Sequence, residues 1–164
     1  MSTTDHDVRI GFARDASGMT MLPDSVLRPR DERDVVDALQ AATAAGTTFT
    51  VAGAQTSTTG ASITERGALM SLRALDGAVK IDLDSGTVRV SCGVIVADLR
   101  RACAEQGLLF TPDPTSDESC TVGGAVACNA SGARSFAYGA TRPHVLALRV
   151  AFADGRVEEF RRPR

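Results

Sequence analysis

The chain has 164 residues, 43% of them hydrophobic, which is enough for one ordinary core but short for two complete domains. A formal net charge of -2 offers no basic field for gathering nucleic acid. No stretch approaches the about 20 apolar residues of a membrane span, and the polar N-terminus lacks the apolar segment of a secretory signal. We therefore expect a cytoplasmic protein with no nucleic-acid partner and no membrane span.

The first clear elements along the chain form a β-α-β unit. Residues 26–27 are a short strand candidate. A helix is predicted over 32–45, because apolar residues recur there at helical spacing between Asp31, an N-cap residue, and Gly46, a stop signal. The β-branched segment 48–53 predicts a strand. Two strands separated by a helix favour parallel pairing.

The rest of the chain alternates strands, helices and loops. The elements expected in chain order are strands at 68–72, 78–83 and 87–93, a helix at 96–106, a turn-rich loop at 111–120, a helical turn at 121–129 and two strands within 145–160. The turns Asp84-Ser85-Gly86 and Asp154-Gly155 indicate hairpins. The predicted fold class is α+β, with a β-α-β unit followed by a mixed or antiparallel sheet and helices.

The four cysteines, at positions 92, 103, 120 and 128, form no C-x-x-C pair. Zinc or iron–sulfur ligation is therefore not expected, and we predict no metal site. Four cysteines are enough for two disulfides. In a chain of this size without a secretory signal, however, reduced and mostly buried thiols are expected instead.

The loop "AGAQTSTTGAS", residues 52–62, leaves a predicted buried strand and is rich in hydroxyl residues. Small residues such as Gly53 and Gly60 let backbone N–H groups approach a ligand, and consecutive N–H groups form an anion-binding nest. Hydroxyls add neutral donors for phosphate oxygens. The alternative is a plain exposed loop. The segment is neither a Walker loop nor a dinucleotide fingerprint, because it lacks G-K-[ST] and G-x-G-x-x-G.

A second candidate is the helical turn 121–129 within "TVGGAVACNASGARSFAYG". Its N-terminus is expected to point free N–H groups outward, with Gly123 and Gly124 keeping that end open. The alternative is tight packing of small residues inside an all-protein core. A ligand with two phosphates would use both loops. On that basis, valine at Gly123 or Gly124 is expected to abolish ligand binding and leave the fold largely intact.

Two long segments, "LRPRDERDVVDALQAATAAGTTFTVAGAQTSTTGAS" and "PDPTSDESCTVGGAVACNASGARSFAYGATRPHVLALRVAFADG", carry a resemblance to a known family. They resemble the FAD-binding domain of the p-cresol methylhydroxylase/vanillyl-alcohol oxidase superfamily. The similarity points to the bacterial FAD-linked oxidases, a group that includes glycolate oxidase FAD subunits and D-lactate and D-2-hydroxyglutarate dehydrogenases. It implies a p-cresol methylhydroxylase-type (PCMH-type) fold, in which FAD lies extended between two α+β subdomains. We expect an N-terminal arm at 1–24 and an FAD-binding domain at 25–164, with subdomains of about 25–84 and 85–164.

The resemblance also implies which residues contact the cofactor. By position they are Gly53, Ala54, Gln55, Thr56, Ser57, Gly60, Pro112, Asp113, Thr121, Val122, Gly123, Gly124, Asn129, Ser131, Gly132, Tyr138, Gly139 and Val145. Gln55 departs from the glycine usual in the family, and a side chain there would narrow the pyrophosphate cradle or require a changed backbone angle. Thr56 stands where related enzymes with covalent flavin often carry histidine, so non-covalent FAD is implied. His144 is expected to be a structural or surface residue.

The family's activity is oxidation of a 2-hydroxy acid of the lactate, glycolate or 2-hydroxyglutarate type to the 2-oxo acid, with hydride transfer to flavin. No catalytic residue is predicted here, because the sequence offers no general base with suitable surroundings and no convincing carboxylate pair. We expect the C-terminal substrate or cap domain to be absent from this chain. The small-molecule substrate would then bind through that missing domain or through a partner chain.

Two other functions remain open. The chain is alternatively a non-catalytic flavin-binding or interaction module, or a subunit needing a separate cap chain, with an exposed apolar face where the cap would sit. A cell-wall precursor reductase shares the fold and uses NADPH. The run "PDPTS" followed by "CTVGG" and "NASGARSFAYG" argues against that reading.

Overall fold

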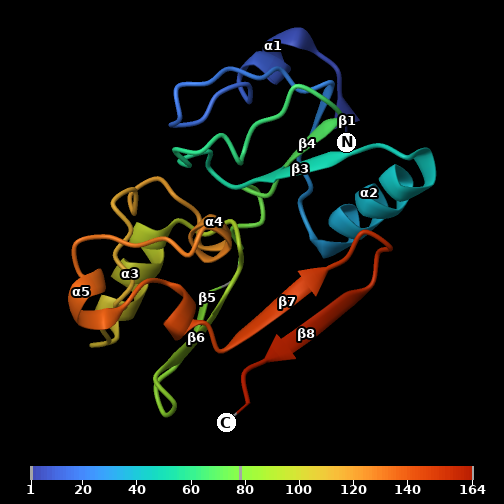
Figure 1. The fold of residues 1–164 in the computed structure, drawn as a ribbon. Coiled ribbons are helices and arrows are strands. Elements are labelled where there is room, and N and C mark those ends of the chain that lie inside the picture. Colours follow the sequence, from blue (N-terminus) through green and yellow to red (C-terminus); the bar gives the residue numbers. More distant parts are fainter. Residues whose placement is uncertain (1, 78, 164) are drawn as a thin grey trace.

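The computed structural model describes residues 2–77 and 79–163, so the first residue of the strand predicted at 78–83 lies outside the described residues. Two lobes are visible in Figure 1. One holds a four-stranded sheet with helices α1 and α2, and the other holds a hairpin with helices α3, α4 and α5. A second hairpin, β7–β8, runs from the second lobe toward α2 (Figure 1).

The sheet of the first lobe has the strand order β1-β2-β4-β3. Its strands are β1 (Ser2–Thr3), β2 (Ser25–Leu27), β3 (Phe49–Ala52) and β4 (Ala68–Ser71). Both β2 and β3 pair parallel to β4, which confirms the expected parallel pairing. All four residues of β4 are buried, because this strand lies at the centre, between the two strands of the β-α-β unit.

Helix α2 (Glu32–Ala45) occupies the range predicted for it. The Asp31 side chain accepts a hydrogen bond from the backbone N–H of Asp34 at 2.8 Å, as an N-cap residue does. The helix ends at Gly46, whose φ of 63° is the left-handed conformation that glycine adopts readily. Val35 and Ala42, seven residues apart, are the buried positions of its inner face.

The N-terminal segment, expected as an arm at 1–24, is joined to the rest of the fold over its described residues and contains two short regular elements. Strand β1 pairs antiparallel with β2. Helix α1 (His6–Ile10) begins at Asp5, whose carboxylate accepts from two backbone N–H groups of the first turn. The Arg9 side chain donates to the Pro23 carbonyl at 2.6 Å. These contacts tie the segment to the sheet.

The second lobe is built on the antiparallel hairpin β5 (Val79–Asp82) and β6 (Thr87–Val90), and this pairing confirms the predicted turn. Helix α3 (Val96–Glu105) buries Leu99 and Cys103 against this hairpin. The subdomain division expected near residue 84 falls in the turn between these paired strands. A division placed before β5 agrees better with the observed pairing.

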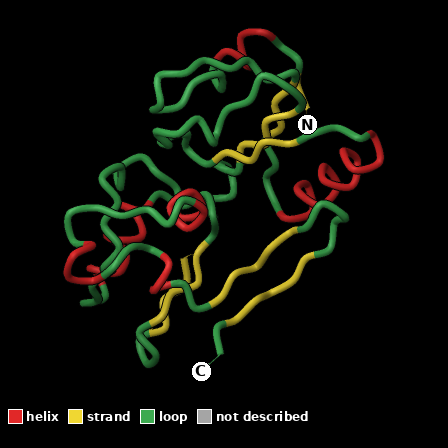
Figure 2. The backbone as a smooth tube through the Cα atoms, in the orientation of Figure 1, coloured by secondary structure: helices red, strands yellow, loops and turns green. Residues whose placement is uncertain are grey.

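Three short helices follow: α4 (Val122–Ala127), α5 (Ser135–Tyr138) and the 3-10 turn η1 (Arg142–His144). Helix α4 lies within the helical turn predicted from the sequence, whereas α5 and η1 carry no periodic signal. Much of this region is loop (Figure 2). The second hairpin, β7 (Ala147–Ala151) and β8 (Val157–Arg161), confirms the strands predicted around Asp154-Gly155.

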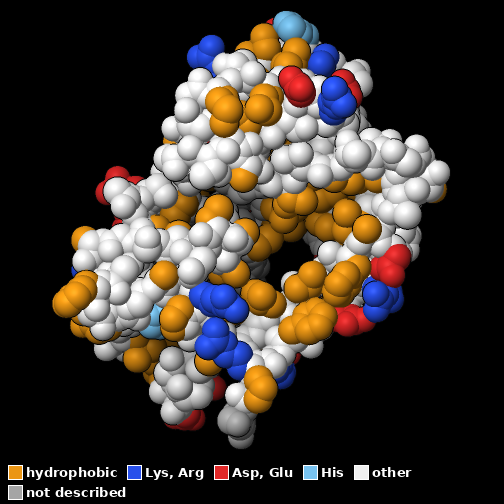
Figure 3. All heavy atoms as spheres, in the orientation of Figure 1, with side chains coloured by type: hydrophobic (Ala, Val, Ile, Leu, Met, Phe, Trp, Pro, Cys, Tyr) orange, Lys and Arg blue, Asp and Glu red, His pale blue; other side chains and the backbone are white. Residues whose placement is uncertain are grey.

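The β7–β8 hairpin lies near the C-terminus of the chain and contacts helix α2. Arg149 forms a two-pronged ion pair with Glu32, at 2.5 and 2.8 Å. The Thr43 hydroxyl donates to the Ala153 carbonyl at 2.5 Å. Between the first sheet, α2 and this hairpin Figure 3 shows an opening rimmed by hydrophobic side chains. Among residues 2–77 and 79–163 no helix is long and apolar enough to cross a membrane.

Candidate functional site

The first predicted cofactor loop leaves the C-terminal end of β3 at Gly53. Ala54, Thr56 and Thr58 form no hydrogen bond with any other residue that the structure describes. Their backbone N–H groups are therefore available to a ligand. Free N–H groups on closely spaced small residues can hold an anion such as a pyrophosphate.

Gln55 sits in this loop with a φ of 57°, in the left-handed region. Its side-chain amide donates to the carbonyl of Phe12 at 2.9 Å and to that of Ser62 at 3.3 Å. The backbone at position 55 thus has the left-handed angle that glycine adopts readily, here with a side chain present. The side chain is engaged by the N-terminal segment.

The far end of the same loop is held by Asp15. Its carboxylate accepts hydrogen bonds from the Ser62 hydroxyl at 3.2 Å and from the backbone N–H of Ser17 at 3.0 Å. Partial burial acts to raise the pKa of Asp15, but hydrogen bonds from Ser17, Ser62 and the Gly60 backbone outweigh it and hold the pKa below its usual value. The charged form of Asp15 therefore stabilises the folded loop.

An Asp15→Asn variant is expected to unfold at a lower temperature than the unmodified chain near pH 7. A carboxyl group with a depressed folded-state pKa contributes stability above its unfolded pKa and loses it as the pH falls through the folded value. The gap between the two proteins should therefore shrink below about pH 4. Thermal unfolding midpoints from pH 7 to pH 3 measure this, and a gap that stays constant over that range would contradict it.

The second predicted loop lies directly against the first. A Cβ atom placed on Gly53 would overlap the Thr121 hydroxyl and stand 3.5 Å from the Thr121 Cβ. Thr121 is almost completely buried and caps α4, accepting a hydrogen bond from the backbone N–H of Gly124 at 3.2 Å. The fold thus brings together two loops that are about 70 residues apart in sequence.

The expectation that the N-terminus of α4 presents free N–H groups is wrong. The N–H of Val122 donates to the Val94 carbonyl and that of Gly123 to the Cys92 carbonyl, each at 2.8 Å, while Gly124 donates to Thr121. The connection between β6 and α3 supplies these acceptors. The first backbone N–H groups of helix α4 are therefore already hydrogen-bonded within the protein.

The two glycines of α4 have different surroundings. A Cβ on Gly123 would stand 2.8 Å from the Cys92 Cβ and 3.0 Å from the Cys92 carbonyl oxygen, so the packing alternative describes this residue. A Cβ on Gly124 would meet only the Thr121 hydroxyl, at 3.1 Å, with open space otherwise. Only Gly124 fits the description of a position kept open for a ligand.

Pro112 and Asp113 belong to a loop that is held in place by ion pairs. The Asp113 carboxylate is paired with the Arg100 guanidinium, which also donates to Asp117 at 2.6 Å. Arg134 lies 3.8 Å from the second Asp113 oxygen. These ion pairs engage the Asp113 side chain within the protein and hold the loop against α3.

The later predicted residues gather around η1. Asn129, at a φ of 46°, accepts a hydrogen bond from the Arg142 backbone N–H at 2.8 Å. His144 joins the Tyr138 carbonyl at 2.9 Å to the Thr111 hydroxyl at 3.2 Å. That bridging position agrees with the structural role expected for His144. Gly139 has a φ of 83°, Ser131 and Tyr138 are exposed, and Val145 is half-buried.

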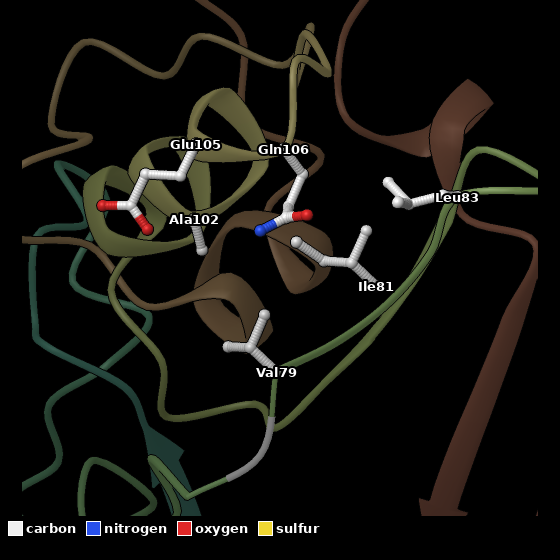
Figure 4. A pocket seen from close by; sticks show the side chains of 6 residues that line it. All are labelled: Val79, Ile81, Leu83, Ala102, Glu105 and Gln106. Carbon is white, nitrogen blue, oxygen red and sulfur yellow. The ribbon is translucent and has the colours of Figure 1, made fainter.

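A hollow of about 350 Å³ lies elsewhere, between β5 and α3. Figure 4 shows its lining: Val79, Ile81, Leu83, Ala102, Glu105 and Gln106. None of these residues belongs to the predicted cofactor set. The hollow is therefore separate from the two loops.

The four cysteines are free thiols; Cys103 and Cys120 are buried, Cys92 is partly buried and Cys128 is exposed, so burial is less general than expected. Burial raises the pKa of the Cys92, Cys103 and Cys120 thiols. Within the part of the chain that the structure describes, no group of three or more His, Cys, Asp or Glu side chains is arranged to hold a metal ion.

The class of the protein follows from this fold and from a match to a family model. Residues 23–161 match the model described as FAD binding domain. The chain therefore belongs to this family of FAD-binding domains, and its cofactor is FAD. The paired loops fit that cofactor, because the first offers unpaired N–H groups on small residues and Gly124 faces open space beside it.

The chain is also similar in sequence to several oxidoreductases. The chain is 31% identical over 149 residues to glycolate oxidase subunit GlcD of Bacillus subtilis, covering 90% of this chain and 32% of that protein. It is 31% identical over 157 residues to D-2-hydroxyglutarate dehydrogenase of Haemophilus influenzae, covering 94% and 15% respectively. A D-lactate dehydrogenase of Anaerostipes hadrus is 37% identical over 109 residues, 66% of this chain and 23% of the relative.

Solved structures confirm the PCMH-type fold. An alkyldihydroxyacetonephosphate synthase superimposes with a TM-score of 0.85 at 22% identity, over 98% of this chain and 32% of that one. The 6-hydroxy-D-nicotine oxidase of Arthrobacter nicotinovorans gives a TM-score of 0.82 at 19% identity, over 98% and 35%. The chain thus spans about a third or less of the relatives and structures it matches.

Proposed function

We propose that this chain is the FAD-binding portion of an oxidoreductase that oxidises a 2-hydroxy acid to the 2-oxo acid. The observation that carries the proposal is the contact between the two predicted cofactor loops, Gly53 against Thr121, beside donors that the chain leaves unpaired. The names of the glycolate, lactate and 2-hydroxyglutarate relatives support the substrate class.

Bound FAD would accept the hydride that leaves the hydroxyl-bearing carbon of the substrate. The residues of this chain bind and orient the cofactor. The N–H groups of Ala54 and Thr56 and the hydroxyl of Thr56 would hold the pyrophosphate, and the buried Thr121 packs against Gly53. Asn129, Gly132 and Tyr138 belong to a segment that we propose lies along the part of FAD beyond the pyrophosphate.

We further propose that FAD is bound without a covalent link and that the protein acts in the cytoplasm. Thr56 is the residue at the position where histidine would carry the flavin, and a threonine hydroxyl is a poor nucleophile without an adjacent base. Burial raises the pKa of the Cys120 thiol, which makes it a weak nucleophile too. Free thiols are typical of a reducing compartment.

The substrate pocket and the group that takes the hydroxyl proton are proposed to lie in a cap domain or a partner chain. Nucleic acid is not a proposed partner. The alternative, a non-catalytic flavin-binding module that docks onto another protein, draws on the apolar rim of the opening in Figure 3. Val51 of β3, Leu148 of β7 and Phe160 of β8 are each more than 40% exposed.

The test is the absorption spectrum of the purified chain after FAD is added and the excess removed. We expect the visible bands of flavin to stay with the protein and to be released into solution by acid. A colourless protein would contradict the proposed site. Flavin that stays with the acid-precipitated chain would contradict the non-covalent attachment alone.

A second measurement tests the substrate class on the protein with its cap domain or partner chain present. Glycolate, D-lactate and D-2-hydroxyglutarate are added in turn without oxygen. Bleaching of the flavin band by one of them is expected. A flavin that stays oxidised with all three, yet is reduced by dithionite, would favour the non-catalytic alternative.

A further inference from the structure

Gln55 adopts a backbone conformation that its residue type disfavours. In the described part of the chain only Gln55 and Asn129 combine a side chain with a positive φ, and glycine holds every other such position. A residue with a Cβ atom avoids this region because the Cβ crowds the backbone. Something must therefore hold Gln55 there.

The contacts of the side chain supply that restraint. The Nε2 group of Gln55 donates to two carbonyl oxygens, one from Phe12, 43 residues away, and one from Ser62, across the loop. Both bonds are at least partly shielded from water. A primary amide has two N–H donors, so the two acceptors use its full donor capacity. The loop is thus fastened to the N-terminal segment through one side chain.

The two bonds act on the backbone that would meet the cofactor. Gln55 stands between Ala54 and Thr56, whose N–H groups have no acceptor among the described residues. The direction of these N–H groups depends on the dihedral angles of Gln55. When a right-handed residue is followed by a left-handed one, the backbone N–H groups around them converge on one point. Fixing the dihedral angles of Gln55 therefore orients the backbone N–H groups of Ala54 and Thr56.

We propose that Gln55 is a positioning residue of the FAD site: its amide, bound to the Phe12 and Ser62 carbonyls, holds the pyrophosphate loop in the left-handed conformation that glycine would adopt unaided. This inference rests on the proposed function, since it concerns the affinity of that site. The N-terminal segment thereby becomes part of the cofactor site although it contributes no predicted contact to FAD.

The experiment compares the FAD dissociation constants of the unmodified chain, Gln55→Met and Gln55→Gly by fluorescence titration. Methionine keeps the side-chain length and the disfavoured angle but loses both hydrogen bonds, so affinity is expected to fall about tenfold. Glycine loses the bonds but adopts the angle freely, so it should restore affinity to within about threefold of the unmodified chain. A purely space-filling role predicts the opposite order. Gln106→Met, on the exposed end of α3, is the matched control and should change nothing.

A second readout needs no FAD. The side-chain amide protons of Gln55 should exchange with solvent more slowly than those of Gln106 in NMR spectra, because only Gln55 uses them in hydrogen bonds. Equal exchange rates, or equal affinity of Gln55→Met and the unmodified chain, would overturn the inference and leave the proposed function standing. Failure of the unmodified chain to bind FAD would overturn the proposed function itself, and the positioning role with it.

Discussion

Replacing Gly132 with alanine is expected to lower the free energy of unfolding by about 3 kcal/mol, at the upper end of the cost of overpacking. An added Cβ would overlap the carbonyl oxygen of Asp113 and stand 2.7 Å from its carbonyl carbon. These are backbone atoms, and the ion pair of Asp113 with Arg100 restrains them from moving away. Relief therefore requires the whole 111–114 loop to shift.

Urea unfolding of Gly132→Ala beside Gly77→Ala measures the effect. Gly77 has nothing within 4 Å of an added Cβ and has no positive φ, so its variant should differ from the unmodified chain by less than about 0.5 kcal/mol. If both variants unfold at the same urea concentration, the close approach of Gly132 to Asp113 is not a feature of the molecule in solution.

Valine at Gly123 and valine at Gly124 are expected to act on different properties. At Gly123 the new side chain meets the Cys92 backbone and Cβ, so the variant should lose about 3 kcal/mol of folding free energy. At Gly124 the branched carbons extend into open space, so stability should change by less than about 1 kcal/mol. FAD affinity should instead fall between about tenfold and a hundredfold, because the methyl groups fill the proposed cofactor space.

Urea unfolding without FAD and FAD titration of each variant separate the two effects. This result would differ from the expectation drawn from sequence, in which both substitutions spare the fold. A stable Gly124→Val variant that binds FAD normally would remove this residue from the proposed site. A stable Gly123→Val variant would show that the packing against Cys92 is loose.

Local signals in the sequence predicted the regular elements well. Helix α2 lies between Asp31 and Gly46 as expected, because capping and termination depend on the neighbouring residues alone. The turns of both hairpins likewise carry their signals within three residues. Segment 2–24 had no such signal: two residues of β1 and five of α1 are too few for periodicity, and pairing with β2 stabilises them.

The candidate site likewise has features that the sequence predicted and features that it did not. Motif order indicated which loops would meet, and the contact of Gly53 with Thr121 agrees with it. Which donors remain free could not be predicted, because the acceptors for Val122 and Gly123 come from Val94 and Cys92, about 30 residues earlier. The left-handed angle of Gln55 likewise depends on a carbonyl 43 residues away. Sequence patterns carry no information about such distant partners.

The attachment of the β7–β8 hairpin to α2 has a consequence for how the chain folds during synthesis. Arg149 follows its partner Glu32 by 117 residues. A ribosome adding about 5–20 residues per second needs on the order of ten seconds to deliver that length. Contacts so distant in sequence also form slowly, because a long loop must close first. Throughout that interval the nascent first lobe presents α2 without the hairpin, so the outer end of α2 is exposed until the last part of the chain has been made.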